Sequence, residues 1–323
     1  MKSVLIFDTV VATLNTGDEI INLLIKKNWP EIYEKNYIMT FPTHTPTFYW
    51  WQNRLMKRNQ IYANADLKFL CGTNILYTNM LRPEPAWNLF LGNTKIAKGT
   101  VCVGTGIGIN SKKTTRYTKS LFNRVLSHEY IHSVRDEKTK KYLEEMGFKA
   151  WNTGCPTLWG LTPDFCAKIP TTKSDSVVFT LTSYEPDREN DQLMIDILKN
   201  NYKKLYFWPQ SLGDAEYIKS FSGYDCIEII APNLKAYDEI LKTNIDYVGN
   251  RLHGGIFAIQ HQCRAIIISI DYRAKEMSKT YSFSCIQREK IQEELEKKIN
   301  SNWSTEIKGL DFEQIEEWKR QFI

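Results

Sequence analysis

The chain has 323 residues, of which 42% are hydrophobic, so it is long enough for two domains that each bury an apolar core. Its 42 basic and 37 acidic residues leave a formal net charge of +5, which fits an anionic substrate or a lipid headgroup surface but is too small and too scattered to indicate nucleic acid. Seven cysteines without a CxxC motif favour reduced thiols in a cytoplasmic protein. We expect neither a signal peptide nor a transmembrane helix, because Asp8 interrupts the first apolar run and no run reaches about 18 residues.

Short β-rich runs alternate with helical patterns in the first half of the chain. Residues 17–28 have apolar positions at helical spacing, and 136–147 read as a second helix that Gly147 closes. The predicted strands of this half are 4–7, 37–41, 67–71, 100–104 and 129–134.

The second half repeats this alternation after a polar stretch at 166–176, which we interpret as a linker. Residues 311–323 read as an amphipathic helix that could pack back on the first domain. Alternating strands and helices predict βαβ units, so the expected fold class is α/β, with two facing Rossmann-like domains (1–170 and 171–323), parallel sheets and a deep cleft. The predicted strands of this half are 177–181, 204–208, 226–230, 245–249 and 265–270.

Residues 245–262, IDYVGNRLHGGIFAIQHQ, place an arginine and a histidine where a predicted strand ends and a predicted helix begins. If Arg251 and His253 extend the strand, both lie on the same side of it, and Gly254 opens the next helix. A helix N-terminus and an arginine fork attract an anion, and a histidine can donate a proton near neutral pH. Taken alone, the pattern is equally typical of an arginine paired with an acidic neighbour and a histidine that caps a turn.

Other strand ends add polar and cationic residues, and ligands of open α/β sheets bind beyond such ends. The sequence VGTGIG at 103–108 is GxGxG and not GxGxxG, so it does not predict a nicotinamide site. In the second half the added residues are Gln210, Ser211, Arg273 and Lys275. In the first half they are Asn15, Gly17, Asp18, Gly72, Thr73, Asn74 and Gly106.

The sequence HEYIH at 128–132 matches the HExxH pattern of zinc proteases. The residues around it favour a strand, in which positions i and i+4 lie roughly 13 Å apart and cannot share one metal ion. We therefore predict a strand here and no metal site. Arg135 then lies at the strand exit, either facing an anion or paired with Asp136 or Glu137.

Taken together, these motifs resemble those of the polysaccharide pyruvyl transferase family. The most specific match is RLH, followed by a small residue, an apolar helix, a strand and Tyr-x-x-Lys, and the second is VRD before a helix that ends in glycine. The resemblance covers most of the chain, in the same order: NTGD (15–18), CGTN (71–74), VGTGIG (103–108), SVRDEKTKKYLEEMG (133–147), WPQSLGD (208–214) and YVGNRLHGGIFAIQHQCRAIIISIDYRAK (247–275).

The resemblance implies a fold like that of two-domain GT-B glycosyltransferases. It also implies transfer of pyruvyl from phosphoenolpyruvate to two hydroxyls of a sugar, in a surface polysaccharide or its lipid-linked precursor, to give a cyclic ketal. The family associates the arginine of VRD and the arginine and histidine of RLH with phosphoenolpyruvate. The donor residues we expect here are Arg135, Arg251, Leu252, His253, Gly254 and Lys275.

We expect His253 to be the general acid and Asp18 to accept the proton of the acceptor hydroxyl. No metal and no cofactor are expected, because phosphoenolpyruvate is a co-substrate. The sequence predicts no oligomeric state. The acceptor residues we expect are Asn15, Gly17, Asp18, Gly72, Thr73, Asn74, Gly106, Gln210 and Ser211.

Residues 47–59, TFYWWQNRLMKRN, combine four aromatic residues with Arg54, Lys57 and Arg58. The simpler interpretation is a partly buried helix with a solvated basic face. The functional alternatives are a platform that stacks on sugars and a contact with an anionic membrane surface. We expect a cytoplasmic protein. If the segment 47–59 contacts a membrane, the protein would lie at the inner face of the cell membrane.

Two other functions remain open at this stage. A glycosyltransferase with a nucleotide-sugar donor would use the same scaffold, and it needs a carboxylate at a strand exit for the ribose. Glu228 lies inside a predicted strand, and Asp214 follows the nearest exit by several residues, so this alternative is less well supported. The third possibility is a non-catalytic carbohydrate-binding protein.

Overall fold

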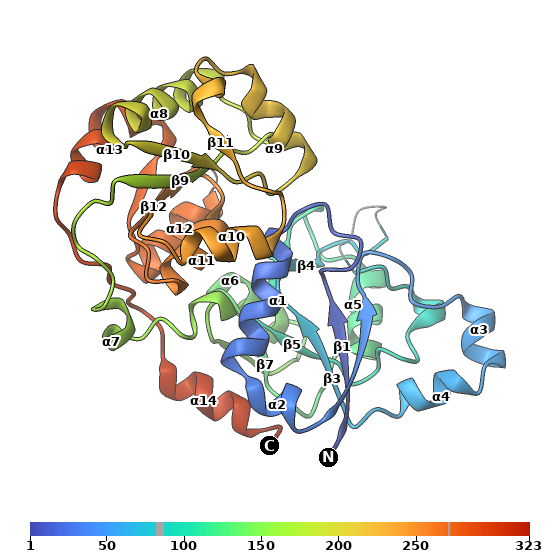
Figure 1. Ribbon diagram of the computed structural model, residues 1–323. Helices are drawn as coiled ribbons and strands as arrows, with labels where there is room; N and C mark the ends of the chain where they lie inside the picture. Colours follow the sequence, from blue (N-terminus) through green and yellow to red (C-terminus); the bar gives the residue numbers. More distant parts are fainter. Residues whose placement is uncertain (82–86, 271) are drawn as a thin grey trace. The chain divides into compact units, whose positions relative to one another are not determined.

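The structure is a computed structural model that describes residues 1–81, 87–270 and 272–323 (Figure 1). The chain divides into two compact units, which differ from the predicted domains 1–170 and 171–323. Unit 1 comprises Met1–Thr13, Ile21–Trp159 and Asp311–Ile323, and unit 2 comprises Leu14–Ile20 and Gly160–Leu310.

Unit 1 is built on a parallel four-stranded sheet with the order β2-β1-β3-β5. All five residues of β3 are buried, as expected for a strand with helices on both faces. The sheet strands are β1 (Ser3–Asp8), β2 (Tyr37–Pro42), β3 (Leu67–Cys71) and β5 (Val101–Val103). Two further parallel pairs are formed by β4 (Asn74–Tyr77) with β6 (Gly106–Gly108) and by β7 (His132–Val134) with β8 (Ala150–Asn152).

The last helix of the chain belongs to unit 1 because its aromatic residues join the core of this unit. The ring centroid of Trp318 lies 5.0 Å from that of Trp29 and 5.9 Å from that of Trp159. Lys319 Nζ also donates a hydrogen bond to the carbonyl oxygen of Asn28 at 2.7 Å. The helices of unit 1 are α2 (Pro30–Glu34), α3 (Trp50–Leu55), α4 (Arg58–Ala63), α5 (Arg116–Val125), α6 (Glu137–Glu144) and α14 (Phe312–Arg320), and α1 (Gly17–Asn28) begins among the residues of unit 2.

Unit 2 is built on a parallel six-stranded sheet with the order β11-β10-β9-β12-β13-β14. Its strands are β9 (Ser176–Thr180), β10 (Lys204–Phe207), β11 (Glu228–Ile229), β12 (Asp246–Gly249), β13 (Ala265–Ser269) and β14 (Cys285–Gln287). Its helices are α7 (Pro163–Cys166), α8 (Arg188–Asn201), α9 (Leu212–Tyr217), α10 (Leu234–Leu241), α11 (Leu252–Gln260), α12 (Tyr272–Tyr281) and α13 (Ile291–Asn300).

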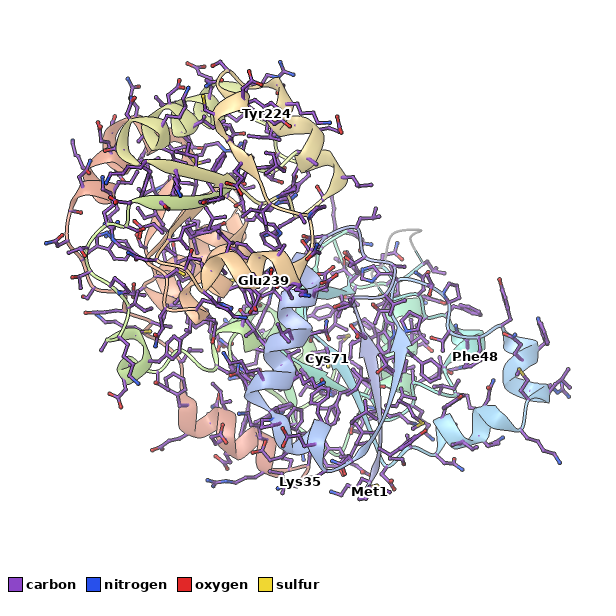
Figure 2. All side chains as sticks on the ribbon, viewed as in Figure 1. Met1, Lys35, Phe48, Cys71, Tyr224 and Glu239 are labelled. Carbon is purple, nitrogen blue, oxygen red and sulfur yellow. The ribbon has the colours of Figure 1, made fainter. Side chains whose placement is uncertain are left out.

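Both faces of the unit 2 sheet are covered. Helices α8 and α13 pack on the face that includes Val248, Ile266 and Ile268. Helix α11 packs on the opposite face, which carries Tyr247 and Ile267, because successive residues of a strand alternate in direction. Side chains fill the space between sheet and helices in each unit (Figure 2).

The strand and helix predictions are mostly confirmed. Helix α1 has the predicted bounds 17–28, and the predicted strand 67–71 is β3. Several predicted strands are shorter in the structure, and the two shortened most are 129–134 and 226–230, of which only 132–134 and 228–229 pair with a neighbour. In the described part of the chain, no helix is long and apolar enough to cross a membrane.

Candidate active site

The carboxyl ends of three neighbouring strands in unit 2 are followed by polar side chains. Thr182 comes two residues after β9, Gln210 three residues after β10, and Asn250 directly after β12. These strands are adjacent in the order β10-β9-β12, so their carboxyl ends meet at the same edge of the sheet. Ligands of open α/β sheets bind at this edge, which makes it the candidate site of unit 2.

Arg251 begins a helix and does not extend a strand. Its backbone is extended, with φ −93° and ψ 97°, and it is the N-cap residue of α11. Leu252 and His253 are the first two residues of this helix. The prediction that Arg251 and His253 lie on the same side of a strand is therefore wrong, because β12 already ends at Gly249.

The two glycines after His253 lie inside α11 and do not open it. A Cβ atom on Gly255 would lie 2.7 Å from the side chain of Ile267, so glycine lets the helix pack closely on the sheet. A Cβ atom on Gly254 would lie 2.5 Å from Nε2 of Gln210. The first turn of α11 is therefore in close contact with the side chain that follows β10.

A buried carboxylate holds the guanidinium group of Arg251. Its Nε donates to Oδ2 of Asp214 at 3.1 Å, and its Nη2 donates to Oδ1 at 2.5 Å and also to Oδ2. Arg251 is 7% exposed and Asp214 is 0% exposed. Nη2 also donates to the hydroxyl of Ser211 at 3.3 Å, so an anion bound here would meet the guanidinium group mainly at Nη1.

Asp214 is itself fixed by several donors. Its Oδ1 accepts from the backbone N–H of Ser183 at 3.0 Å and from the Ser183 hydroxyl at 3.1 Å. Its Oδ2 accepts from the backbone N–H of Gln210 at 3.2 Å, and its own N–H donates to the hydroxyl of Ser211, the N-cap of α9, at 3.1 Å. This network fixes the orientation of Arg251, which also lies 4.9 Å from the centroid of the Tyr184 ring.

The segment that opens α1 lies against Gln210 within unit 2. The carbonyl oxygen of Gln210 accepts from the Thr16 N–H at 3.1 Å and from the Thr16 hydroxyl at 3.2 Å. Asn15 accepts from the Gly17 N–H at 3.0 Å, and a Cβ atom on Gly17 would lie 3.2 Å from Oε1 of Gln210. Asn15 and Gly17, which were predicted from the first half of the chain, are therefore grouped with Gln210 in unit 2. Asp18 follows them and is 9% exposed.

Four buried polar atoms at this sheet edge lack a hydrogen-bond partner among the described residues. They are Oγ1 of Thr182, Nε2 of Gln210, and Oδ1 and Nδ2 of Asn250. A buried polar atom without a partner destabilises a fold by about 1–3 kcal/mol, so folded proteins contain few of them. Their concentration at the ends of three adjacent strands is typical of a site that a polar ligand completes.

The remaining predicted donor residues of unit 2 lie on two helices. Leu252 and His253 in α11 are 5% and 9% exposed. Lys275 lies in α12, and its Nζ donates to Oε1 of Gln287, the last residue of β14, at 3.3 Å. Lys275 is thus associated with the end of the edge strand β14, which lies two strands from β12 in the same sheet.

Arg135 forms the corresponding arginine site of unit 1. Its Nη2 donates to Oδ1 of Asn74 at 2.5 Å, and its Nε pairs with Oδ2 of Asp136 at 3.4 Å. Its backbone N–H donates to the carbonyl oxygen of Thr105 at 3.1 Å. A Cβ atom on Gly106 would lie 2.6 Å from Oδ1 of Asn74, so glycine is required beside this pair. The structure therefore brings together three predicted residues, Asn74, Gly106 and Arg135.

Gly72 and Thr73 form the turn between β3 and β4 that leads to Asn74. Both have left-handed backbones, with φ of 69° and 46°. A non-glycine residue such as Thr73 adopts this conformation at an energetic cost, which is typical of turns at functional sites. The carbonyl oxygen of Thr73 accepts from the Gly106 N–H at 2.8 Å, which ties the turn to the Arg135 site.

The HEYIH sequence does not form a helical metal motif, and the strand prediction is confirmed for 132–134. Nδ1 of His132 accepts from the backbone N–H of Cys102 at 3.0 Å, so Nε2 carries the proton and donates to the carbonyl oxygen of Ser127 at 2.9 Å. Burial lowers the pKa of His132 to about 4. This histidine is therefore a neutral residue that joins two strands and a loop.

The sequence analysis did not select Asp214, Ser183 or Asp8 as site residues. The Ser211-x-x-Asp214 spacing is typical of a helix start, but it carries no signal for a pair with Arg251, 37 residues away. Asp8 ends β1, and burial raises its pKa, while a hydrogen bond from the Val10 N–H and the nearby His44 partly oppose this rise. A carboxylate with a raised pKa at a strand end is a candidate general base.

The chain belongs to the polysaccharide pyruvyl transferase family. The family profile matches residues 15–272, which include both arginine sites. Membership defines the protein as one of a transferase family that acts in polysaccharide biosynthesis. No curated protein matches the chain.

Solved structures support the α/β, GT-B-like fold with two Rossmann-like units. The UDP-GlcNAc 2-epimerase of Methanocaldococcus jannaschii, in complex with UDP-GlcNAc and UDP, is 15% identical, with a TM-score of 0.53 and coverage of 98% of this chain and 99% of that chain. The UDP-GlcNAc 2-epimerase of Neisseria meningitidis, bound to UDP-GlcNAc, is 13% identical, with a TM-score of 0.51 and coverage of 99% of this chain and 100% of that chain. At such low identity the similarity concerns the fold alone.

Proposed function

We propose that the protein transfers the pyruvyl group of phosphoenolpyruvate to two hydroxyls of one sugar. The acceptor would be part of a surface polysaccharide or of its lipid-linked precursor, and the products would be a cyclic ketal and phosphate. The observation that carries this proposal is the position of Arg251, which a buried carboxylate fixes at the N-cap of α11, two residues before His253.

Phosphoenolpyruvate is a small dianionic or trianionic molecule, so its site needs cations and N–H donors. Nη1 of Arg251 and the N-terminus of α11 would supply both in unit 2. The unpartnered amides of Gln210 and Asn250 support a polar ligand beside them. Arg135 of unit 1 is the second arginine that the family resemblance associates with the donor.

The proposed reaction balances with residues of this chain as acid and base. His253 would protonate C3 of phosphoenolpyruvate, which leaves an electron-poor C2 that the first sugar hydroxyl attacks. The second hydroxyl would then form the other C2–O bond as the bond from C2 to the phosphate oxygen breaks. Of the two hydroxyl protons released, one balances the proton gained by C3 and the other leaves with phosphate.

Two carboxylates are candidates for the base that accepts the hydroxyl proton. Asp18 lies in the first turn of α1, next to the segment that contacts Gln210. Asp8 lies at the end of β1, and burial raises its pKa above the ordinary value of a carboxylic acid. We propose Asp18 as the base, and comparison of Asp18→Asn with Asp8→Asn would identify which carboxylate acts.

The proposal is tested by incubating the protein with phosphoenolpyruvate and candidate glycans. We expect release of phosphate together with a glycan mass increase of one pyruvyl ketal. Cleavage of a nucleotide sugar without phosphate release from phosphoenolpyruvate would favour the glycosyltransferase alternative. The variant His253→Ala should lower turnover by about 10² or more, and near-full activity would exclude the general-acid role.

Only part of the guanidinium group of Arg251 can bind the donor. Since Nε and Nη2 donate to Asp214 and Nη2 also donates to Ser211, the donor would meet Nη1. Arg251→Lys would lose Nη1, so we expect a higher KM for phosphoenolpyruvate. An unchanged KM would argue against contact between Arg251 and the donor.

A further inference from the structure

Large apolar side chains are exposed together on one part of unit 1, formed by β2, α3 and α4. Helices α3 and α4 project from the sheet of this unit (Figure 1). The exposed side chains are Leu55 at 73%, Ile61 at 65%, Tyr37 at 63%, Tyr49 at 59%, Trp51 at 47% and Met56 at 39%. We call these six residues, together with Arg54 and Lys57, the apolar-basic surface. A contiguous set of this kind marks an interaction site on a soluble domain.

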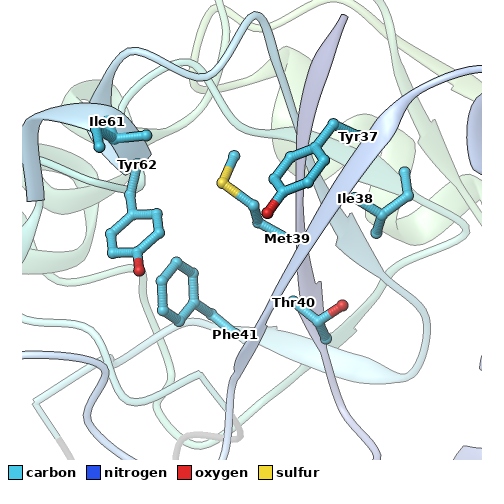
Figure 3. Close-up of a pocket in the computed structure, with 7 residues that line it drawn as sticks. All are labelled: Tyr37, Ile38, Met39, Thr40, Phe41, Ile61 and Tyr62. Atoms are coloured by element: carbon cyan, nitrogen blue, oxygen red, sulfur yellow. The ribbon is translucent and has the colours of Figure 1, made fainter. Parts of the chain in front are cut away.

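A pocket of about 410 Å³ lies next to these residues. Figure 3 shows the side chains of β2 facing those of α4 around it. It is lined by Tyr37, Ile38, Met39, Thr40, Phe41, Ile61 and Tyr62. β2 is the edge strand of the unit 1 sheet, so among the described strands of this sheet none covers the pocket from that side.

The exposed residues belong to an ordered segment that aromatic packing fixes to the sheet. The ring of Phe41 in β2 lies 5.7 Å from that of Phe48 and 4.8 Å from that of Tyr62. The Tyr49 N–H donates to Oε1 of Gln52 at 2.9 Å, which caps α3. The predicted single, partly buried helix at 47–59 is wrong, because Met56 and Lys57 separate two short helices and the apolar side chains between them face outward.

The charge of this surface has one sign. From residue 35 to residue 65 the sequence contains no Asp or Glu, and it contains Lys35, Arg54, Lys57 and Arg58. Arg54 and Lys57 are exposed, and neither forms a salt bridge with any residue that the structure describes. The cations therefore remain available to an external anionic partner.

We propose that the apolar-basic surface docks the protein on an anionic lipid bilayer. Trp51 and Tyr49 are suited to the interface between headgroups and acyl chains, where one end of an aromatic ring is apolar and the other is hydrated. Leu55 at the end of α3 and Met56 directly after it would enter the acyl region. Arg54 and Lys57 would contact lipid phosphates.

Two features favour a bilayer over a protein partner. Helices α3 and α4 have six residues each, which is too short for a helix that fills a groove of another protein. The surface lacks acidic residues and combines cations with exposed aromatic and aliphatic side chains, which fits anionic headgroups above acyl chains. The inference does not depend on the proposed function, because binding to vesicles requires neither donor nor acceptor.

The test is cosedimentation with vesicles of phosphatidylcholine alone and of phosphatidylcholine with phosphatidylglycerol in equal parts. The wild-type protein should bind the anionic vesicles, and less so at high salt. Arg54→Gln with Lys57→Gln should weaken this binding about 30-fold, since each cation near an anionic surface contributes about fivefold. Trp51→Ser with Leu55→Ser should weaken it by about 10² or more.

A matched control removes the same kinds of side chain elsewhere. Ile229→Ser with Lys235→Gln changes an exposed isoleucine and an exposed lysine of unit 2 and should leave vesicle binding unchanged. Thermal unfolding of each variant verifies that it is folded. The proposal is overturned if the wild-type protein binds neither vesicle, or if the substitutions at 51 and 55 change its oligomeric state and not its vesicle binding. The second result would assign the surface to contact between copies of the chain.

Discussion

The two arginine sites differ in how the positive charge of the arginine is balanced. Arg251 in unit 2 donates to a carboxylate, Asp214, that is fully buried and has further donors around it. Arg135 in unit 1 donates to the neutral amide of Asn74 and pairs at 3.4 Å with Asp136, whose side chain is 42% exposed. We therefore expect Arg251 to contribute mainly orientation and structure, and Arg135 to contribute more of the positive potential that attracts an anion.

The largest expected effect is on the stability of unit 2. Asp214→Asn leaves the charge of Arg251 buried without compensation, so we expect a loss of about 3–5 kcal/mol in the free energy of unfolding. The control is Asp136→Asn in unit 1, where asparagine still caps α6 and the lost ion pair is partly exposed, so its effect should stay below about 1 kcal/mol. Denaturant unfolding measures both. Equal losses of unfolding free energy in the two variants would contradict the proposed difference between the two arginine sites.

The second effect concerns donor affinity at the Arg135 site. Arg135→Gln should raise the KM for phosphoenolpyruvate roughly 10- to 100-fold, because a hydrogen bond from a charged group contributes about 1.5–3 kcal/mol. Since Asn74 is neutral, the free energy of unfolding should fall much less than in Asp214→Asn. Steady-state kinetics and denaturant unfolding of the same variant separate the two quantities. A normal KM would show that Arg135 has a structural role only.

A third prediction concerns pH and is specific to the strand that leads to Arg135. Burial holds the pKa of His132 at about 4, below its ordinary value, so the folded state keeps this ring neutral while the unfolded state takes up a proton. Its contribution to stability is therefore present above about pH 6.5 and is lost as the pH falls towards 4, by up to about 1.4 kcal/mol per pH unit. His132→Gln should remove this slope, as measured by denaturant unfolding across that range. An identical slope in the variant would assign the acid sensitivity to other groups.

The smallest effect tests the contact between Gly254 and Gln210. Alanine at Gly254 should gain about 1 kcal/mol of helix propensity, and displacement of the Gln210 amide should offset most of it. We therefore expect nearly unchanged stability for Gly254→Ala alone. In the Gln210→Ala background the same substitution should stabilise the protein by about 1 kcal/mol. Equal effects in both backgrounds would mean that the methyl group of alanine at 254 does not displace the Gln210 amide.

Several features of the fold were predictable from the sequence because they depend on local patterns. Helix 17–28 and strand 67–71 have clear periodicity or a short apolar run, and the structure has the same bounds. The strand at 132–134 was predictable although the sequence matches the HExxH pattern, because its residues are strand formers. In contrast, the short strands β4, β6, β8 and β14 are only three or four residues long and carry too little periodicity for prediction.

The sequence by itself determined the α/β alternation, the family resemblance and the identity of both arginines, since all three depend on residue type and order along the chain. Tertiary structure alone decided what each arginine contacts. Asp214 lies 37 residues before Arg251, and Asn74 lies 61 residues before Arg135. The same holds for residues 14–20, which belong to unit 2 although they occur in the first half of the chain, whereas the return of 311–323 to the first domain was predicted from the sequence. Such long-range pairs form only when the sheets bring strand ends together, and no local pattern records them.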